Sequence, residues 1–160
     1  LTAATREVID EINRARTDPV DYARDLSAYE FSQSDLSETI AFLEKVPRLR
    51  VLYPHTGLLR MAQTYVEDTA SRSSISHPQP LGSRADTHLS GETFRLLREI
   101  VNAGTTSPRE AVARFVVNPG DAGKGYRAAL FDDSITHIGA AFGIHDQYGT
   151  ICVVELARLE

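Results

Sequence analysis

The sequence predicts an α+β layered domain in which helices come first and a β-hairpin comes last. Apolar residues recur every three or four positions in several segments before residue 118, as on one face of a helix. Residues 137–144 instead alternate in character with the period of a strand, and residues 151–156 are nearly all apolar. Residues 145–149 between them have the composition of a turn. A hairpin that follows a set of helices favours an α+β arrangement over a parallel sheet.

The first half of the chain is expected to contain four helices, because each apolar stripe follows a residue that commonly starts a helix. The start signals are Thr5 as a cap, Asp18 with Pro19, Ser37, and Thr56 with Gly57. The segment from Ser71 to Ser90 has no such stripe and contains two prolines, a glycine and two histidines. We expect a long loop there, and long loops in small domains are often functional.

A further helix is predicted to begin at Ser107. Ser107 has the chemistry of a capping residue, Pro108 suits the first helical position, and Glu110 is placed to reach back to the cap amide. Asn118, Pro119 and Gly120 end the helix. The hairpin over residues 137–156 completes the predicted elements, and no repeat or linker divides the chain, so residues 1–160 are expected to form a single domain.

Composition excludes several classes of function. The chain has 160 residues, 42% hydrophobic and 24% charged, as in ordinary globular domains. Its formal net charge is −5 and it has no basic run, which excludes nucleic acid as an expected partner. No stretch has the roughly 20 apolar residues of a membrane helix. No signal peptide is visible, and the start at Leu1 is compatible with a processed mature form or an excised domain.

Familiar catalytic motifs are absent from the sequence. There is no Gly-x-Ser-x-Gly, His-Glu-x-x-His or Cys-x-x-Cys, and the glycines near residue 123 lack the ending of a phosphate-binding loop. Cys152 is the only cysteine, and its apolar neighbours indicate a small core residue rather than a catalytic thiol. The five histidines are scattered without the spacing of a preformed metal site, so each is first read as a surface or structural residue.

Three segments, in order, resemble the CAP superfamily of cysteine-rich secretory, antigen 5 and pathogenesis-related proteins. They are Ile12-Asn13-Arg14-Ala15-Arg16 with Pro19 and Tyr22, then Leu58 to Ala70 with Ser76-His77, and finally Glu99 to Gly104 with Ser107 to Val112. The last match continues through Gly125-Tyr126-Arg127 and His137-Ile138-Gly139 to the hairpin with Tyr148-Gly149-Thr150. The resemblance implies an α-β-α sandwich with a central antiparallel sheet flanked by helices, of the bacterial style without disulfides.

The resemblance also implies a polar cleft of two histidines and one or two acids, which in some members holds a divalent metal such as zinc. His77 matches the first histidine and Glu99 the first acid, although Glu92 after Gly91 is a competing candidate. Tyr126 takes the place of the second histidine. Because a phenol must lose a proton of pKa near 10 to bind zinc well, and His77 and Glu99 alone are too few ligands, a degenerate metal site is expected.

Three interpretations of the function stay open. The leading one is a non-catalytic CAP-type binding module, secreted or periplasmic, with an unknown protein, lipid or small-molecule ligand in a cleft of His77, Glu99 and Tyr126. In that cleft Tyr126 would hydrogen-bond Glu99 or His77, either to hold a ligand or to tie the long loop to the helices. The second is a peptidase-like hydrolase in which His77 and Glu99 are catalytic. The third is a structural or interaction domain of a longer protein.

Overall fold

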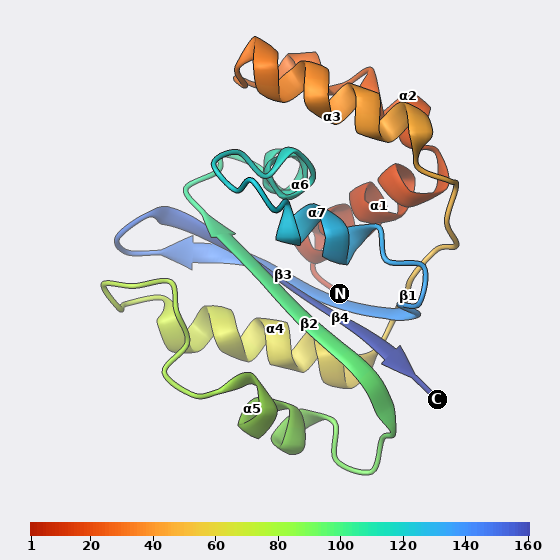
Figure 1. Ribbon diagram of the computed structural model, residues 1–160. Coiled ribbons are helices and arrows are strands. Elements are labelled where there is room, and N and C mark those ends of the chain that lie inside the picture. The colour runs from red at the N-terminus through yellow and green to blue at the C-terminus, as the bar shows by residue number, and fades with distance from the viewer.

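A four-stranded sheet with helices on both faces forms the domain (Figure 1). The computed structural model describes all residues, 1–160. The strands are β1 (Tyr53–Pro54), β2 (Phe94–Ala103), β3 (His137–His145) and β4 (Gly149–Leu159). The helices are α1 (Ala3–Thr17), α2 (Pro19–Ala23), α3 (Gln33–Lys45), α4 (Thr56–Thr69), α5 (Leu81–His88), α6 (Pro108–Val117) and α7 (Gly125–Leu130), with a short 3₁₀ turn η1 (Leu26–Ala28).

The sheet has the order β1-β3-β4-β2 and is antiparallel except at one edge. The predicted hairpin is present as β3 and β4, joined through the turn at residues 146–148. Strand β1 is only two residues long and pairs parallel with the start of β3. The sheet is therefore mixed rather than purely antiparallel, because the chain reaches β3's free edge in the same direction as β3 runs.

Helices α4 and α5 cover one face of the sheet, while α1, α6 and α7 cover the other, with α2 and α3 farther out (Figure 1). The larger core cluster lies between the sheet and α1 and α6. Two smaller clusters lie beneath α4 and α5. None of the helices is long and apolar enough to cross a membrane. The α+β fold and its sandwich of layers thus agree with the prediction.

Local capping explains most of the helix starts. Asp18 and Ser107 accept hydrogen bonds from Asp21 and Glu110, as expected. Helix α1 is capped by Thr2 rather than by Thr5, and α3 begins four residues before Ser37. Glu110 reaches the amide of Thr106, one residue before the cap.

Helix α5 and strand β2 differ from the prediction, and the shorter elements β1 and α7 were not predicted either. The expected loop over residues 71–90 contains helix α5, which follows Pro80 and has no side-chain cap to announce it. Strand β2 was not predicted, because its apolar residues Leu96, Leu97, Ile100 and Val101 also fit helical spacing. A bulge between Phe94 and Leu96 further disturbs the alternation that marks a strand.

Candidate functional site

The centre of the site is a pair of glutamates on neighbouring strands. Glu99 on β2 and Glu155 on β4 are direct register partners in the antiparallel ladder. Side chains directly opposite each other in such a ladder lie on the same face. Glu155 is 0% exposed and lies on the α4 and α5 face, between the two smaller apolar clusters. Two acids are thus brought together in a place where water cannot solvate both of them.

Arg84 of helix α5 closes this pair. Its Nη1 and Nη2 donate to the two carboxylate oxygens of Glu99 at 2.6 and 2.8 Å. Its Nη1 also lies 3.9 Å from Oε1 of Glu155. The Nε of Arg84 also donates to the carbonyl of Gln79. The central carbon of the guanidinium lies 5.1 Å from the centre of the Tyr65 ring. One buried cation therefore faces one buried acid and one partly buried acid.

Arg84, Glu99 and Glu155 together have no net charge, because one of the two acids keeps its proton. Burial raises the pKa of Glu155 well above its ordinary value, and the neighbouring charge of Glu99 raises it further. Burial would also raise the pKa of Glu99, but the hydrogen bonds and charge of Arg84 outweigh it and the pKa is lowered. Glu99 is thus the anion and Glu155 the neutral acid. The structure gives neither carboxyl oxygen of Glu155 a hydrogen-bond partner, and Glu99 is the acid directly opposite it in the ladder.

His77 joins the same cluster from the connection between α4 and α5. Its side chain is 2% exposed, and its Nδ1 accepts from the backbone N–H of Gln79 at 2.9 Å. That bond places the ring proton on Nε2, which donates to Asp68 Oδ2 at 2.9 Å. The ring centre of Tyr65 lies 5.1 Å from that of His77. Tyr65 therefore contacts both His77 and Arg84, and burial raises the pKa of its phenol to about 12.

Tyr126 does not belong to the cluster, and the expected hydrogen bond to Glu99 or His77 is wrong. Tyr126 is the second residue of helix α7, and its backbone N–H donates to the side-chain oxygen of Asn118. Its ring packs against Phe115 of α6 at a centre distance of 5.6 Å. Helices α6 and α7 lie across the sheet from α4 and α5 (Figure 1). The sheet itself thus separates Tyr126 from the two residues with which it was grouped.

The other candidates of the sequence have local roles. Glu92 lies apart, where its carboxylate bonds Nε2 of His55 at 3.1 Å. His55 caps helix α4 by accepting from Gly57, and His145 accepts the amides of Gln147 and Tyr148 in the β3–β4 turn. Cys152 is buried in the core, and burial raises the pKa of its thiol.

Comparison with known proteins places the chain in a family. Residues 9–156 match the family described as CAP, the cysteine-rich secretory protein family. The chain belongs to the CAP family. No protein of curated function has a significantly similar sequence.

Solved structures of CAP-type proteins share the fold at low sequence identity. A cysteine-rich secretory protein from Staphylococcus aureus aligns with a TM-score of 0.56 and 9% identity over 99% of this chain, which spans only 41% of that protein. A venom allergen-like protein of Schistosoma mansoni aligns with a TM-score of 0.57 and 11% identity, over 100% of this chain and 91% of that one. An outer surface protein of Borrelia burgdorferi aligns with a TM-score of 0.54 and 19% identity, over 82% of this chain and 97% of that one.

The donors in this CAP domain do not fit the divalent metal that the family resemblance implies. Both oxygens of Glu99 are taken by Arg84, and both ring nitrogens of His77 are engaged, one with Asp68 and one with Gln79. No group of three or more His, Cys, Asp or Glu side chains is arranged to hold a metal ion. The positive charge facing the carboxylates comes from an arginine of the chain itself.

Arg84 and Glu155 are the members of the cluster that sequence reasoning missed. Glu155 carried a usable signal in the sequence, because it is the one charged residue within the nearly all-apolar run of residues 151–156. Buried acids of this kind are rare unless they are paired. Arg84 carried no such signal in the sequence, because it lies in a segment expected to be a loop. It meets Glu99 only through the packing of α5 on the sheet.

Proposed function

We propose that this CAP domain is a non-catalytic binding module, secreted or periplasmic, whose His/Glu cleft is partly degenerate. The observation that carries the proposal is the bidentate pair of Arg84 with Glu99. A general base must have a free lone pair within reach of the proton that it removes. Here Arg84 holds both carboxylate oxygens of Glu99 and lowers the pKa of that acid, which makes it a weaker base, and the side chain of His77 is buried with both nitrogens bonded.

The energetic cost of opening the cluster supports the same conclusion. Withdrawing Arg84 would leave Glu99 and Glu155 together in an apolar setting without a counter-charge, and breaking a buried pair in this way typically costs about 3–5 kcal/mol. A substrate would have to supply that free energy before any chemistry began. The cluster is better suited to fixing α5 and the α4–α5 connection against the sheet, so that binding takes place on other surfaces of the domain.

Secretion or export follows from the family as an expectation, since the family's description names secretory proteins and one structural neighbour is an outer surface protein. It is tested by fractionating cells of the source organism that carry the full gene. Recovery of the chain outside the cytoplasm is expected, and recovery only within the cytoplasm would contradict this part of the proposal.

A hydrolase screen tests the absence of catalysis. Purified domain is assayed against peptide, ester and phosphoester substrates beside the variants His77→Ala and Glu99→Gln. We expect the wild-type domain to show no turnover above the two variants. Turnover that is lost in both variants, while their circular dichroism spectra stay unchanged, would overturn the proposal.

A further inference from the structure

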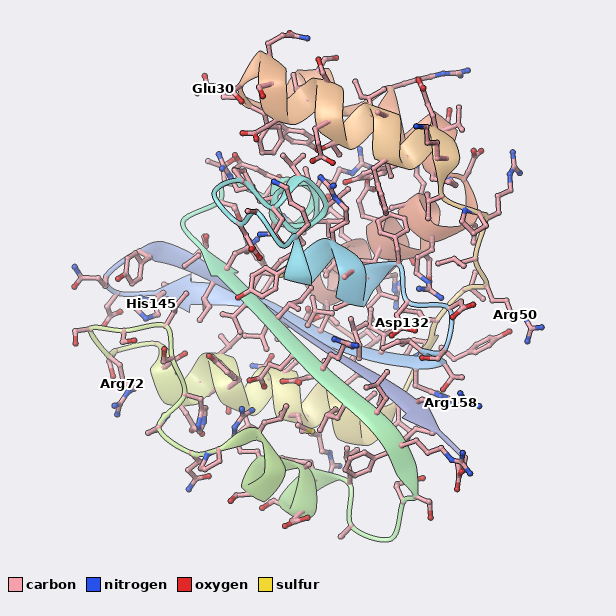
Figure 2. The ribbon with its side chains drawn as sticks, in the orientation of Figure 1. Glu30, Arg50, Arg72, Asp132, His145 and Arg158 are labelled. Atoms are coloured by element: carbon pink, nitrogen blue, oxygen red, sulfur yellow. The ribbon has the colours of Figure 1, made fainter.

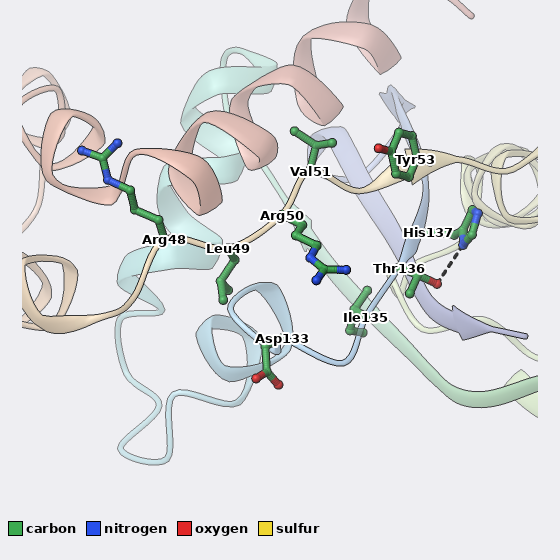
Figure 3. A pocket seen from close by; sticks show the side chains of 9 residues that line it. All are labelled: Arg48, Leu49, Arg50, Val51, Tyr53, Asp133, Ile135, Thr136 and His137. Carbon is green, nitrogen blue, oxygen red and sulfur yellow. Dashed lines mark hydrogen bonds between the residues drawn. The ribbon is translucent and has the colours of Figure 1, made fainter.

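A cavity of about 870 Å³ lies at the β1 edge of the sheet (Figure 3). Its size is within the range of about 300–1,000 Å³ that is usual for small-molecule sites. One wall is the extended segment 48–53, and the other is the segment 133–137 that leads into β3. The cavity shares no residue with the polar cluster, and nothing in the function proposed above uses it.

A buried arginine fixes both walls of this cavity. Arg16 of α1 donates from Nε to the carbonyl of Arg50 on one wall at 3.1 Å. Its Nη1 donates to the carbonyls of Leu130 and Asp132, at 2.7 and 3.0 Å, just before the other wall. Its own carbonyl accepts from the amide of Leu49 at 2.8 Å. Burying a cation is costly unless it is hydrogen-bonded, so these bonds must be kept in the folded state. Because they join both walls to α1, the cavity is formed before any ligand binds.

Asn13, one turn earlier on α1, fixes the first wall a second time. Its side-chain oxygen accepts from the amide of Leu52 at 2.7 Å, and its side-chain nitrogen donates to the carbonyl of the same residue at 3.1 Å. Leu52 is thereby buried, and its neighbours Val51 and Tyr53 are turned outward, 41% and 62% exposed. Apolar side chains are thus held at the surface by polar bonds beneath them.

The lining combines an apolar surface with one unpaired cation. Leu49, Val51 and Ile135 provide apolar wall, and Tyr53 adds an aromatic ring. The side chain of Arg50 has neither an ion pair nor a hydrogen bond, and Figure 3 shows its guanidinium between the two walls, beside Ile135. An arginine fork in this position suits a carboxylate, which can accept two parallel hydrogen bonds from it.

The remaining charged and titratable groups restrict how much negative charge the cavity can accept. Arg48 also lines the cavity, but its guanidinium is exposed and lies 3.8 Å from Asp18, which is not a lining residue. Asp133 on the opposite wall has no ion pair and would repel a second negative charge. His137 supplies no further cation, because burial and the nearby His55 lower its pKa, and its Nδ1 is bonded to Thr136.

We propose that this cavity binds a small organic monoanion with an apolar body, such as an aryl-alkyl carboxylate. Its carboxylate pairs with Arg50, and its apolar part lies along Leu49, Val51 and Ile135. This site stands whether or not the His77 cluster is catalytic, because the two places have no residue in common.

Titration of the labelled protein with phenylpropanoate, followed by amide NMR shifts, tests the proposal. Shifts are expected at residues 48–53 and 133–137. The Arg50→Gln variant should weaken binding about ten-fold or more, as loss of a charge-assisted hydrogen bond does. The matched control is Arg72→Gln, another exposed arginine that lies at the far end of the molecule (Figure 2) and should leave affinity unchanged. Phenylpropanamide, which lacks the charge, should bind as weakly to the wild type as the acid binds to Arg50→Gln.

Three results would overturn the proposal. The first is saturating phenylpropanoate without shifts in the two wall segments. The second is equal affinity of Arg50→Gln and the wild type, with the fold of the variant verified by its unchanged amide spectrum. The third is tighter binding of phenylsuccinate than of phenylpropanoate. Phenylsuccinate has a second carboxylate, so it should bind no more tightly than phenylpropanoate if the cavity accepts monoanions.

Discussion

Replacing Glu155 by Gln is expected to stabilise the protein at neutral pH. The buried carboxyl keeps its proton in the folded state, whereas in the unfolded chain it ionises with an ordinary pKa of 4.5. Each pH unit above that value costs ~1.4 kcal/mol of folding free energy, which gives about 3 kcal/mol near pH 7. Gln has the shape of the neutral acid and no proton to hold, although one of its N–H groups would lack a partner at a cost of about 1 kcal/mol. The expected gain is ~1–3 kcal/mol.

The sign of this effect fixes its pH dependence. Since the folded pKa of Glu155 lies above the unfolded one, its contribution to stability is fully present below about pH 4.5 and is lost as the pH rises through the folded pKa. The advantage of Glu155→Gln should therefore be large near pH 7 and absent near pH 4.5. Urea unfolding at the two pH values measures it, with Glu44→Gln on the exposed face of α3 as a control that should show no such change.

Destabilisation by Glu155→Gln at neutral pH would refute this reasoning. That result would mean that Glu155 is ionised in the folded protein and that its pairing with Arg84, 3.9 Å away, outweighs the cost of burial. The charge distribution assigned to the cluster would then have to be reversed.

Three further predictions follow from packing and buried charge. Gly139→Ala should lower the free energy of unfolding by more than ~3 kcal/mol or prevent folding, because the added Cβ would lie 2.1 Å from the backbone of Leu58. The control Gly82→Ala should be tolerated, because its Cβ would meet nothing within 4 Å. Thermal unfolding of both variants tests this prediction. Arg127→Met should lower the free energy of unfolding in urea by about 2–4 kcal/mol, because it leaves the buried carbonyls of Val116 and Val117 without their donor, and a loss under 1 kcal/mol would contradict this. The thiol of Cys152 should react with a disulfide reagent only at the rate of unfolding, and immediate labelling of the native protein would show that it is accessible.

Elements with a strong local signal could be predicted from the sequence. The hairpin of β3 and β4 has strand alternation before the turn and a nearly continuous apolar run after it, and helix α6 has a capping serine and a proline at its start. Strand β2 could not be recognised, because the spacing of its apolar residues fits a helix as well. Only its pairing with β4, whose partner residues lie 48 to 65 positions later in the chain, makes it a strand.

The site could be predicted only in part, for a related reason. His77 and Glu99 were found by resemblance, and the structure brings both into contact with Tyr65 or its partner Arg84. The meeting of Glu99 with Glu155 depends on strand register, and that of Arg84 on how α5 packs, neither of which is a local property. Tyr126 was misplaced because sequence position in a motif does not tell on which side of the sheet a side chain lies.

Native mass spectrometry with added zinc tests the central claim most directly, namely that Arg84 takes the place of a metal in this CAP domain. The wild type and His77→Ala are compared in the same zinc concentration series. The account predicts the same distribution of weak, non-specific adducts for both proteins. A single-zinc adduct that forms on the wild type and is lost in His77→Ala would contradict it and would restore a functional metal site.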